Sequence, residues 1–403
     1  MNRDFGASPS ASLAELCEGV LRASTASGER RGTPYLYTRP SPARYPWQWY
    51  WDSCFAAIVW RRFDRDRARA ELETLIRGMR PDGFVGHVVF WDHPVSLRRL
   101  VYYNVASRSA EMTGTIQPPL LAWAWRIAVG DPADERGISI HHEWLRTNRD
   151  LEGDGLLWLV QPDESGLDSS PKYDPVWGSR AHAKWGFPFL VHRNRRLGWD
   201  ARRVREAGGP VLCETMTNVL WGLARLAAGE PSITPALVDR LWDERSGLFL
   251  DESQPGGARP LVNTWAALSP LALPDLPEEL GRRLVEEHLL DPAKYWLAVP
   301  PPSVAATEPT FEPNRGTGWK RRYWRGPTWI NAAWLLWLGM RRLGYEAQAS
   351  EMVERLIPVI LREGLREYYD PHSGEGLGAT DFAWTSLALE MADPDPGSVG
   401  SYL

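Results

Sequence analysis

The stretch WDSCFAAIVWRRFDRDRARAELETLIRGMR, residues 51–80, decides the fold class. In residues 51–63 and again in 65–80, apolar side chains recur at i, i+3, i+4 and i+7, which places them on one face of a helix. Asp64 stands between the two segments, where its carboxylate can cap the helix that begins at Arg65. The stretch therefore predicts two helices joined by a short turn.

The same periodicity recurs along the rest of the chain. It predicts helices over 10–24, 117–129, 136–147, 211–228, 234–242, 277–289, 327–343, 346–363 and 380–391. Pro118 and Pro327 stand where the first turn of a helix accepts proline. Gly130 and Gly344 follow the last periodic residue, where helices end. Convincing strands are few, so the chain is expected to be all-α.

The connections between these helices alternate between short and long. Long stretches rich in Gly and Pro cover residues 81–115, 151–200, 251–275 and 291–326, and loops of that length in a compact domain are usually functional. The pattern predicts a single domain over residues 1–403 in which six helical hairpins close into an (α/α)6 barrel. The long loops, above all the first, second and fourth, would lie at one rim over the functional site.

The composition excludes several classes of protein. A net charge of −5 argues against a nucleic-acid or anionic-membrane partner, because both require a basic surface. There is no apolar run of membrane-spanning length and no secretory signal at the N-terminus. Cys17, Cys54 and Cys213 form no CxxC pair, so neither a disulfide framework nor a zinc site is expected. These features predict a soluble, cytoplasmic protein without a metal.

Tryptophan is unusually abundant, with 22 residues beside 13 Tyr and 10 Phe. A buried indole N–H needs a partner, which makes Trp an awkward core residue. A sugar ring offers C–H faces to an aromatic plane and hydroxyls to an indole N–H. The composition therefore fits a sugar-binding protein and fits equally a large helical core that uses Trp.

Four segments are dense in residues that can recognise a sugar. The first is YPWQWYWD, residues 45–52, which brings aromatic rings and one carboxylate to the start of a helix. Asp52 there can accept two sugar hydroxyls while the helix N-terminus keeps it ionised. The alternative is that Asp52 merely caps its helix.

The second segment is DESGLDSSP, residues 163–171, which lies in a long predicted loop. Asp168 is followed by two small hydroxyl residues and preceded by Gly166. Catalytic groups concentrate on loops carried by a rigid scaffold. An Asx turn, in which Asp168 bonds its own backbone, explains the same residues equally well.

The third segment is WKRRYWRGPTW, residues 319–329, which runs into the predicted helix 327–343. Arg325 can bind hydroxyls or a carboxylate, or orient a catalytic acid. For residues 320–322 a solvated basic face is the better interpretation.

The fourth segment is EYYDPHSGEGLG, residues 367–378, which follows a predicted helix and holds two glutamates around a glycine-rich turn. Glycine there lets backbone approach a ligand. Cleavage of a glycoside needs one protonated carboxylic acid and one ionised carboxylate. Asp168 can supply the first and either Glu367 or Glu375 the second, and the residue types alone do not choose.

Two further motifs are weak. The run from His141 to Glu143 lacks the HExxH spacing of a zinc protease. Residues 148–153 begin like a calcium loop, but position 12 is Leu159 rather than Glu, so a polar turn is the better interpretation. There is also no Walker loop and no GxGxxG before a helix.

Taken in order, the segments resemble glycoside hydrolase families 63 and 37, which hold processing α-glucosidases and trehalases. The trehalase pattern YYWDSYF is similar to residues 49–55 (WYWDSCF), and its Gly-His-Ile and Ser-Gln-Pro-Pro are similar to 86–88 and 116–119. Its ESGWD resembles ESGLD at 164–168, its EKYD resembles EYYD at 367–370, and DGFGWTNG resembles DFAWTS at 381–386. The resemblance runs from about residue 35 to residue 390 and is strongest to the short bacterial branch of family 63, which includes mannosylglycerate and glucosylglycerate hydrolases.

The resemblance implies roles for particular residues. Asp168 corresponds to the family's general acid, Glu367 to its general base and Glu375 to a sugar-binding glutamate. The implied substrate-binding set is Tyr45, Trp47, Trp51, Asp52, His87, Gln117, Gly166, Trp324, Arg325, Gly326, Glu375 and Trp384. Leu167 departs from the family by replacing the Trp before the acid, and the arginine-rich lining of trehalases is not recognisable. Trehalose is therefore a poor first substrate.

We expect an inverting α-glycosidase that needs no cofactor and acts on a small glucoside or mannoside, with 2-O-α-mannosyl- or glucosyl-glycerate preferred. Arg180, His182, Lys184 and Arg325 are candidates to bind a glycerate carboxylate. The alternatives are an α-glucosidase on short sugars similar to nigerose, kojibiose or trehalose, and a non-catalytic sugar-binding toroid. An epimerase or lyase is disfavoured because the eight His residues do not cluster. The sequence is silent on oligomeric state, and a homo-oligomer stays open.

Overall fold

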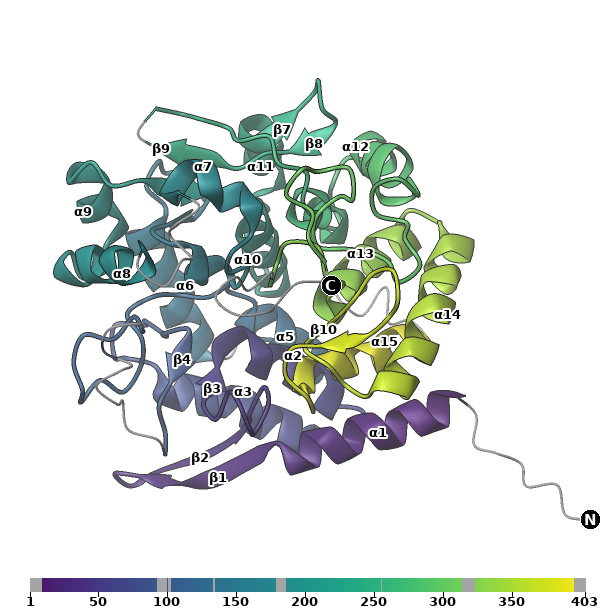
Figure 1. Ribbon diagram of the computed structural model, residues 1–403. Helices are drawn as coiled ribbons and strands as arrows, with labels where there is room; N and C mark the ends of the chain where they lie inside the picture. Colours follow the sequence, from purple (N-terminus) through teal and green to yellow (C-terminus); the bar gives the residue numbers. More distant parts are fainter. Residues whose placement is uncertain are drawn as a thin grey trace, which may run out of the picture.

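Six helical segments form a closed ring at the centre of the computed structural model, which describes residues 9–92, 100, 103–132, 135–178, 186–254, 256–313 and 323–394 (Figure 1). Each contacts the next in chain order, and the last contacts the first. They are α2 (Tyr50–Trp60), α5 (Leu121–Ala128), α10 (Thr215–Ala227), the 3-10 helix η4 (Trp265–Ala272), α13 (Ile330–Arg342) and the 3-10 helix η6 (Ala383–Leu387).

The ring is apolar on all sides because it is enclosed on all sides. Every residue of α2 and of η4 is buried, as is α13 from Ile330 to Met340. A helix that is hydrophobic all round is stable only when other elements cover it. The ring is therefore the core against which the remaining helices pack.

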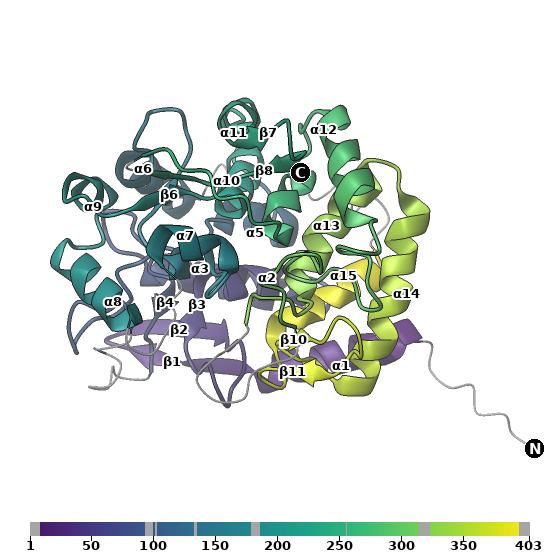
Figure 2. The same ribbon diagram turned by 45° about the horizontal axis from the view of Figure 1, so that its top comes forward.

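A second set of helices lies outside the ring and alternates with it along the chain (Figure 2). Several of these helices pack on a ring segment: α3 on α2 and α5, α11 on α10, the π-helix η5 on η4, and α14 on α13. Helix α1 contacts the ring at α2 and η6, and it also contacts the outer helices α14 and α15. These helices are α1 (Pro9–Ala23), α3 (Arg65–Gly78), α6 (Arg136–Arg149), α11 (Thr234–Leu241), α12 (Glu278–Arg283), η5 (Leu284–Leu289), α14 (Glu346–Glu363) and α15 (Ala388–Ala392).

Most of the helices predicted from periodicity are confirmed. The predicted cap is also confirmed, since the Asp64 carboxylate accepts a hydrogen bond of 2.9 Å from the Arg67 N–H. The prediction that Pro118 and Pro327 lie in first helical turns was wrong, because α5 begins at Leu121 and α13 at Ile330. Among the described helices, none has the length and apolar character needed to cross a membrane.

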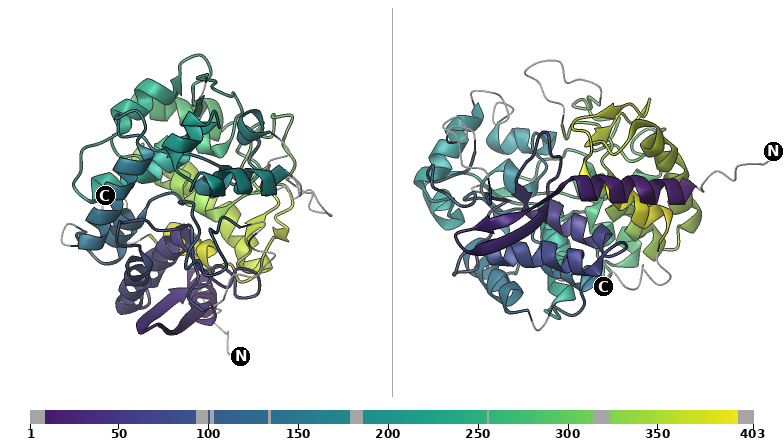
Figure 3. Two further views of the ribbon diagram at one scale, coloured as in Figure 1. Left: turned by 90° about the vertical axis from the view of Figure 1, so that its left-hand side faces the viewer. Right: turned by 90° about the horizontal axis from the view of Figure 1, so that it is seen from below.

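Strands are short, and the longest pair is a hairpin that the sequence pattern did not predict. Strands β1 (Thr25–Arg30) and β2 (Thr33–Thr38) pair antiparallel through a turn in which Arg31 and Gly32 have φ of 52° and 80°. Arg-Gly is a weak signal for such a turn compared with Asn-Gly or Asp-Gly. The hairpin and α1 lie across the underside of the molecule (Figure 3, right).

Smaller strand pairs carry the loops that build the site. They are β3 (Gln48–Trp49) with β4 (Val88–Val89), β10 (Tyr368–Tyr369) with β11 (Gly376–Leu377), β7 (Trp242–Asp243) with β8 (Leu248–Phe249), and the sheet β5 (Trp158–Leu159), β6 (Val211–Cys213), β9 (Glu252–Gln254). The prediction of helix from residue 211 was wrong at its start, because β6 precedes α10. The chain is mainly helical but is not purely all-α.

The long predicted loops contain short helices. Within residues 151–200 the chain forms η1 (Pro162–Ser165), η2 (Pro171–Tyr173), α7 (Asp174–Trp177) and α8 (Gly186–Arg196), and α9 (Ala201–Glu206) follows. Each 3-10 helix starts with a proline, whose fixed φ suits the first helical position. Periodicity cannot reveal elements of three or four residues, since they complete only about one turn.

Candidate active site

Glu367 lies at the start of the β10–β11 hairpin and is completely buried. Its Oε1 accepts hydrogen bonds from the hydroxyls of Tyr45, at 2.8 Å, and Tyr323. Its Oε2 accepts a 2.8 Å hydrogen bond from the Ala379 N–H and lies 3.5 Å from Nη1 of Arg44. Both oxygens are therefore held by hydrogen-bond donors, which fix the position of the carboxylate.

Gly378 makes this close approach possible. Its φ is +72°, and a Cβ there would lie 2.5 Å from Glu367 Oε2. The Glu367 N–H also donates to the Ala379 carbonyl at 2.9 Å, so backbone and side chain both bind the same residue across the hairpin. Only glycine satisfies the space and the backbone angle at residue 378.

Asp52 lies in the first turn of α2 with 4% of its surface exposed. It does not cap the helix: the N-cap residue is Trp49, and Gln117 Oε1 accepts the Trp51 N–H at 3.1 Å. Burial raises the pKa of Asp52 well above its usual value, and the charge of Glu367 adds to that increase. Its Oδ1 accepts no hydrogen bond from the described residues. The two carboxylates thus share one electrostatic environment.

Asp168 lies on the turn that follows η1 and is partly buried. Burial raises the pKa of Tyr323 well above its usual value, with the charges of Glu367, of Tyr45 and then of Asp168 adding to it. The Tyr323 hydroxyl thus donates to Glu367 and senses Asp168. Glu367 is therefore hydrogen-bonded to a tyrosine whose pKa also responds to the charge of Asp168, although the two carboxylates are far apart in sequence.

The turn that carries Asp168 is tightly packed. Gly166 has a φ of +71°, and a Cβ there would lie 2.5 Å from Cζ2 of Trp51. The Ser165 hydroxyl accepts hydrogen bonds from the Tyr173 hydroxyl at 2.6 Å and from the Leu167 N–H at 3.0 Å. The glycine predicted at the site therefore serves close contact between the turn and the first turn of α2.

Aromatic rings from distant elements gather beside these carboxylates. Trp384 contacts Trp51 edge-on with ring centroids 5.1 Å apart, and it lies 5.7 Å from Trp329. Trp324 stacks on Trp329 at 3.8 Å with an interplanar angle of 8°. The indole nitrogens of Trp324 and Trp384 are buried without a hydrogen-bond partner among the described residues. Among the predicted site aromatics, Trp51, Trp324 and Trp384 therefore belong to one packed group, which Trp329 joins.

Two predicted residues serve more as framework than as exposed ligands. His87 is buried, and its Nδ1 bonds to the Thr115 hydroxyl. Burial lowers the pKa of His87 to about 3, so the ring is neutral at ordinary pH. Trp47 packs with Val88, Phe90 and Val105 in a small separate apolar cluster. Both residues still border the β3–β4 pair that leads into α2.

The other predicted positions lie in different surroundings. Arg325 binds Asp174 of α7 at 2.6 Å, and Gly326, with a φ of +148°, packs against the backbone of Pro313. Glu375 is exposed on the turn before β11. Residues 180, 182, 184 and 320–322 fall outside the described residues.

The turn at 148–155 has the geometry of a polar turn. The two carboxylate oxygens of Asp150 accept the N–H groups of Gly153, at 2.7 Å, and Gly155, at 3.0 Å. Across the described ranges, no group of three or more His, Cys, Asp or Glu residues is arranged to hold a metal ion.

The sequence model of the mannosylglycerate hydrolase MGH1-like glycoside hydrolase domain matches residues 45–385. The chain belongs to this family. The enzyme is a glycoside hydrolase, as the resemblance to family 63 implied. It is 31% identical over 417 residues to a mannosylglycerate hydrolase of Thermus thermophilus, covering 89% of this chain and 97% of the relative. It is 25% identical to a glucosylglycerate hydrolase of Mycolicibacterium hassiacum, covering 87% and 93%.

Solved structures agree with this assignment. A family 63 mannosylglycerate hydrolase from Thermus thermophilus in complex with Tris superposes with a TM-score of 0.77 at 28% identity, covering 94% of this chain and 99% of that one. Neutral trehalase from Saccharomyces cerevisiae shares the fold, with a TM-score of 0.55 at 15% identity, over 97% and 82%. The prediction of a helical toroid is thereby confirmed at the level of the fold.

The structure also brings to these segments residues to which the sequence assigned no role. Tyr323 and Arg44 reach Glu367, while Arg149 forms a buried ion pair with Glu164, four residues before Asp168. Tyr323 lies inside the quoted segment 319–329, but only its neighbours Trp324, Arg325 and Gly326 were assigned to the substrate-binding set. Nothing in the spacing of Arg44 or Arg149 indicates a carboxylate partner.

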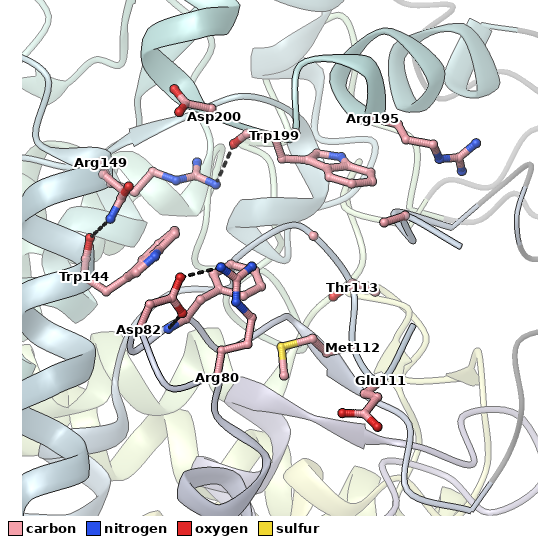
Figure 4. A pocket seen from close by; sticks show the side chains of 15 residues that line it. Arg80, Asp82, Glu111, Met112, Thr113, Trp144, Arg149, Arg195, Trp199 and Asp200 are labelled. Carbon is pink, nitrogen blue, oxygen red and sulfur yellow. Dashed lines mark hydrogen bonds and ion pairs between the residues drawn. The ribbon is translucent and has the colours of Figure 1, made fainter. Parts of the chain in front are cut away.

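A cavity of 570 Å³ does not include Glu367 in its lining. Figure 4 shows the side chains that line it. It is lined by residues that include Phe84, Met112, Trp144, Arg149 and Trp199. None of the predicted site residues lines it. Arg149 therefore borders this cavity while its guanidinium binds Glu164, in the turn that leads to Asp168.

Proposed function

We propose that the enzyme is an inverting α-glycosidase that hydrolyses mannosylglycerate or glucosylglycerate. One observation carries the proposed chemistry: the buried Glu367 carboxylate is held by Tyr323, a hydroxyl whose pKa also responds to Asp168. The named activities of the relatives support the substrate class. The finer architecture belongs to the same proposal, in which the closed ring and the helices outside it make six hairpins of an (α/α)6 barrel in one catalytic domain.

In this mechanism Asp168 is the general acid. It donates its proton to the glycosidic oxygen as the bond to the anomeric carbon breaks, so that this oxygen departs as a hydroxyl group rather than as an alkoxide. Asp163 lies beside it, and its own pKa is raised well above the usual value by burial and by the charge of Asp168. Two close carboxyl groups disfavour double ionisation, which supports keeping a proton on the pair.

Glu367 is the general base. It removes a proton from a water that attacks the opposite face of the sugar, so an α-linked substrate gives a β-sugar. Three hydrogen bonds to its oxygens hold the carboxylate in a fixed position for this role. Room for the water implies carboxyl groups roughly 6.5–9.5 Å apart.

The sugar that loses its aglycone is held by the group around α2. The unsatisfied Oδ1 of Asp52 and the amide of Gln117 are placed to bind hydroxyls, and Trp51 and Trp384 offer ring edges and faces. The glycerate carboxylate needs a cation on the leaving-group side. Arg325, whose guanidinium is already fixed by Asp174, is the described candidate.

The test is to follow the anomeric protons of the released sugar by NMR with mannosylglycerate, glucosylglycerate, trehalose, maltose, nigerose and kojibiose. Release of β-hexose from a glycerate glycoside, lost in Asp168→Asn and Glu367→Gln, is the expected result. An α-hexose as first product would overturn the inverting mechanism. Hydrolysis of a disaccharide but of neither glycerate glycoside would overturn the substrate.

A further inference from the structure

Arg149, the last residue of α6, and Glu164, in η1, form a buried ion pair next to the turn that carries Asp168. Their side chains are 1% and 0% exposed. Arg149 Nη1 donates to Glu164 Oε2 at 2.7 Å, and Nη2 donates to Oε1 at 2.6 Å. Two parallel hydrogen bonds of this kind fix the direction as well as the position of the carboxylate.

The pair ties several segments together. Glu164 also accepts the N–H groups of Ile116, at 3.2 Å, and Val160, at 2.7 Å. Arg149 also donates to the carbonyls of Trp158, at 3.2 Å, and Trp199, at 3.4 Å. The end of α6, strand β5, η1 and the chain before Gln117 therefore meet at this ion pair.

A cavity borders Arg149, so close packing does not hold its side chain there. The 570 Å³ cavity borders that residue, with Trp144 and Trp199 beside it (Figure 4). The guanidinium carbon lies 5.9 Å from the Trp144 ring centroid. Protein interiors resist displacement because they are close-packed. Beside a cavity that resistance is reduced, so the position of the Arg149 side chain depends more on its hydrogen bonds.

Stability alone does not explain why a buried ion pair occurs at this place. Replacing a buried ion pair by well-packed apolar residues is often neutral or stabilising, so such a pair is weak evidence of a stabilising role. Here the carboxylate belongs to the turn that ends, four residues later, in Asp168. A fixed direction at Glu164 sets where that turn begins.

We propose that Arg149 is a positioning residue for the general acid. Through Glu164 it holds the 161–170 turn so that Asp168 reaches the glycosidic oxygen. The inference rests on the proposed function, because it assumes that Asp168 protonates the leaving group. It predicts that weakening the pair impairs protonation and leaves water attack intact.

The test compares two leaving groups. A glycerate glycoside leaves only with a proton from the acid, whereas an α-glycosyl fluoride loses fluoride ion without one, and in both cases Glu367 takes the proton of the attacking water. Arg149→Lys keeps the charge and loses the double hydrogen bond. We expect kcat/KM for the glycerate glycoside to fall about 10²-fold, since small misplacements cost that much, with fluoride hydrolysis unchanged.

The matched control is Arg61→Lys. Arg61 donates to both oxygens of the fully buried Glu390 at 2.7 and 2.8 Å, from the end of α2 to α15. The Arg61→Lys variant should have a lower melting temperature, as Arg149→Lys should, but should hydrolyse both substrates at the wild-type rate. Equal loss of both reactions in Arg149→Lys would overturn the inference. A wild-type enzyme that cleaves no glycerate glycoside would instead overturn the proposed function.

A second measurement uses the cavity. Removal of the side chain in Arg149→Ala joins its space to a cavity large enough to admit small solutes. Millimolar guanidinium should then restore cleavage of the glycerate glycoside, whereas urea, of similar shape but neutral, should not. Equal restoration by both would assign the loss to packing and overturn the inference.

Discussion

The two carboxylates of the proposed mechanism, Glu367 and Asp168, lie on short turns that are held in different ways. Glu367 is bound directly, by two tyrosine hydroxyls, one backbone N–H and a nearby guanidinium. Around Asp168 the buried charges are paired with each other, Arg149 with Glu164 and Lys172 with Glu214.

The difference fits what each group must do. A base must be held where it can reach the attacking water, and Glu367 is held by two tyrosine hydroxyls and one backbone N–H, with the Arg44 guanidinium nearby. On the side of Asp168, the buried cations Arg149 and Lys172 bind Glu164 and Glu214, and these pairs hold the segment that carries the acid. The pKa of the neighbouring Asp163 is raised by burial and by the charge of Asp168, and two close carboxyl groups disfavour double ionisation.

The largest expected effect distinguishes the roles of Glu367 and Asp168. Glu367→Gln should lower hydrolysis of both a glycerate glycoside and an α-glycosyl fluoride by about 10³-fold or more, because no base remains to activate water. Asp168→Asn should lower only the first reaction, since fluoride leaves without a proton. Steady-state kinetics with both substrates decides the matter, and an Asp168→Asn enzyme equally impaired on fluoride would contradict the assignment.

The next test addresses the hairpin that holds Glu367. Gly378→Ala places a Cβ 2.5 Å from Oε2 at a φ of +72°, so the carboxylate must move and kcat should fall about 10²-fold. Gly364→Ala is the control, because its φ is +79° but a Cβ there meets nothing within 4 Å. Both variants should lose stability, by about 1 kcal/mol for the backbone strain alone. Equal activities would show that the close contact is unimportant.

A smaller effect is expected when one donor to Glu367 is removed. Tyr323→Phe keeps the ring and deletes the hydroxyl that donates to Glu367 Oε1, so the carboxylate is held less firmly. The value of kcat should fall about tenfold, because the base is less well positioned. A raised KM with kcat unchanged would argue that the tyrosine only binds substrate.

The smallest effect concerns the neighbour of the acid. Burial and the charge of Asp168 raise the pKa of Asp163 well above its usual value. Asp163→Asn removes the like charge, so Asp168 loses its proton more readily. Activity is lost as pH rises and the acid ionises, and the basic limb of the profile should move to lower pH with little change at the optimum. A shift to higher pH would contradict the coupling.

Much of the helical framework could be predicted from the sequence because amphipathic periodicity is a local property. Residues 346–363 were predicted as a helix and form α14 with the same bounds. The ring segment η4 was missed, because it is apolar on every side, contains Pro270 and follows 3-10 geometry. A helix buried all round has no polar face to create a period.

Part of the candidate site could also be predicted from local sequence motifs. Asp52, Asp168 and Glu367 stand in motifs whose order carries the resemblance, and the structure gathers them into one electrostatic neighbourhood. The exposed position of Glu375 and the pairing of Arg325 with Asp174 were not visible in the sequence. Both depend on how the loops lie after folding.

The sequence by itself determined the helices, the motif order and the candidate carboxylates, because each follows from residues close together in the chain. Only the tertiary structure decided which donors reach those carboxylates. Tyr45 and Glu367 are 322 residues apart, and their hydrogen bond forms because the last segment of the ring, η6, packs against the first, α2. Contacts made by closing a ring depend on every segment in between, so no single motif encodes them.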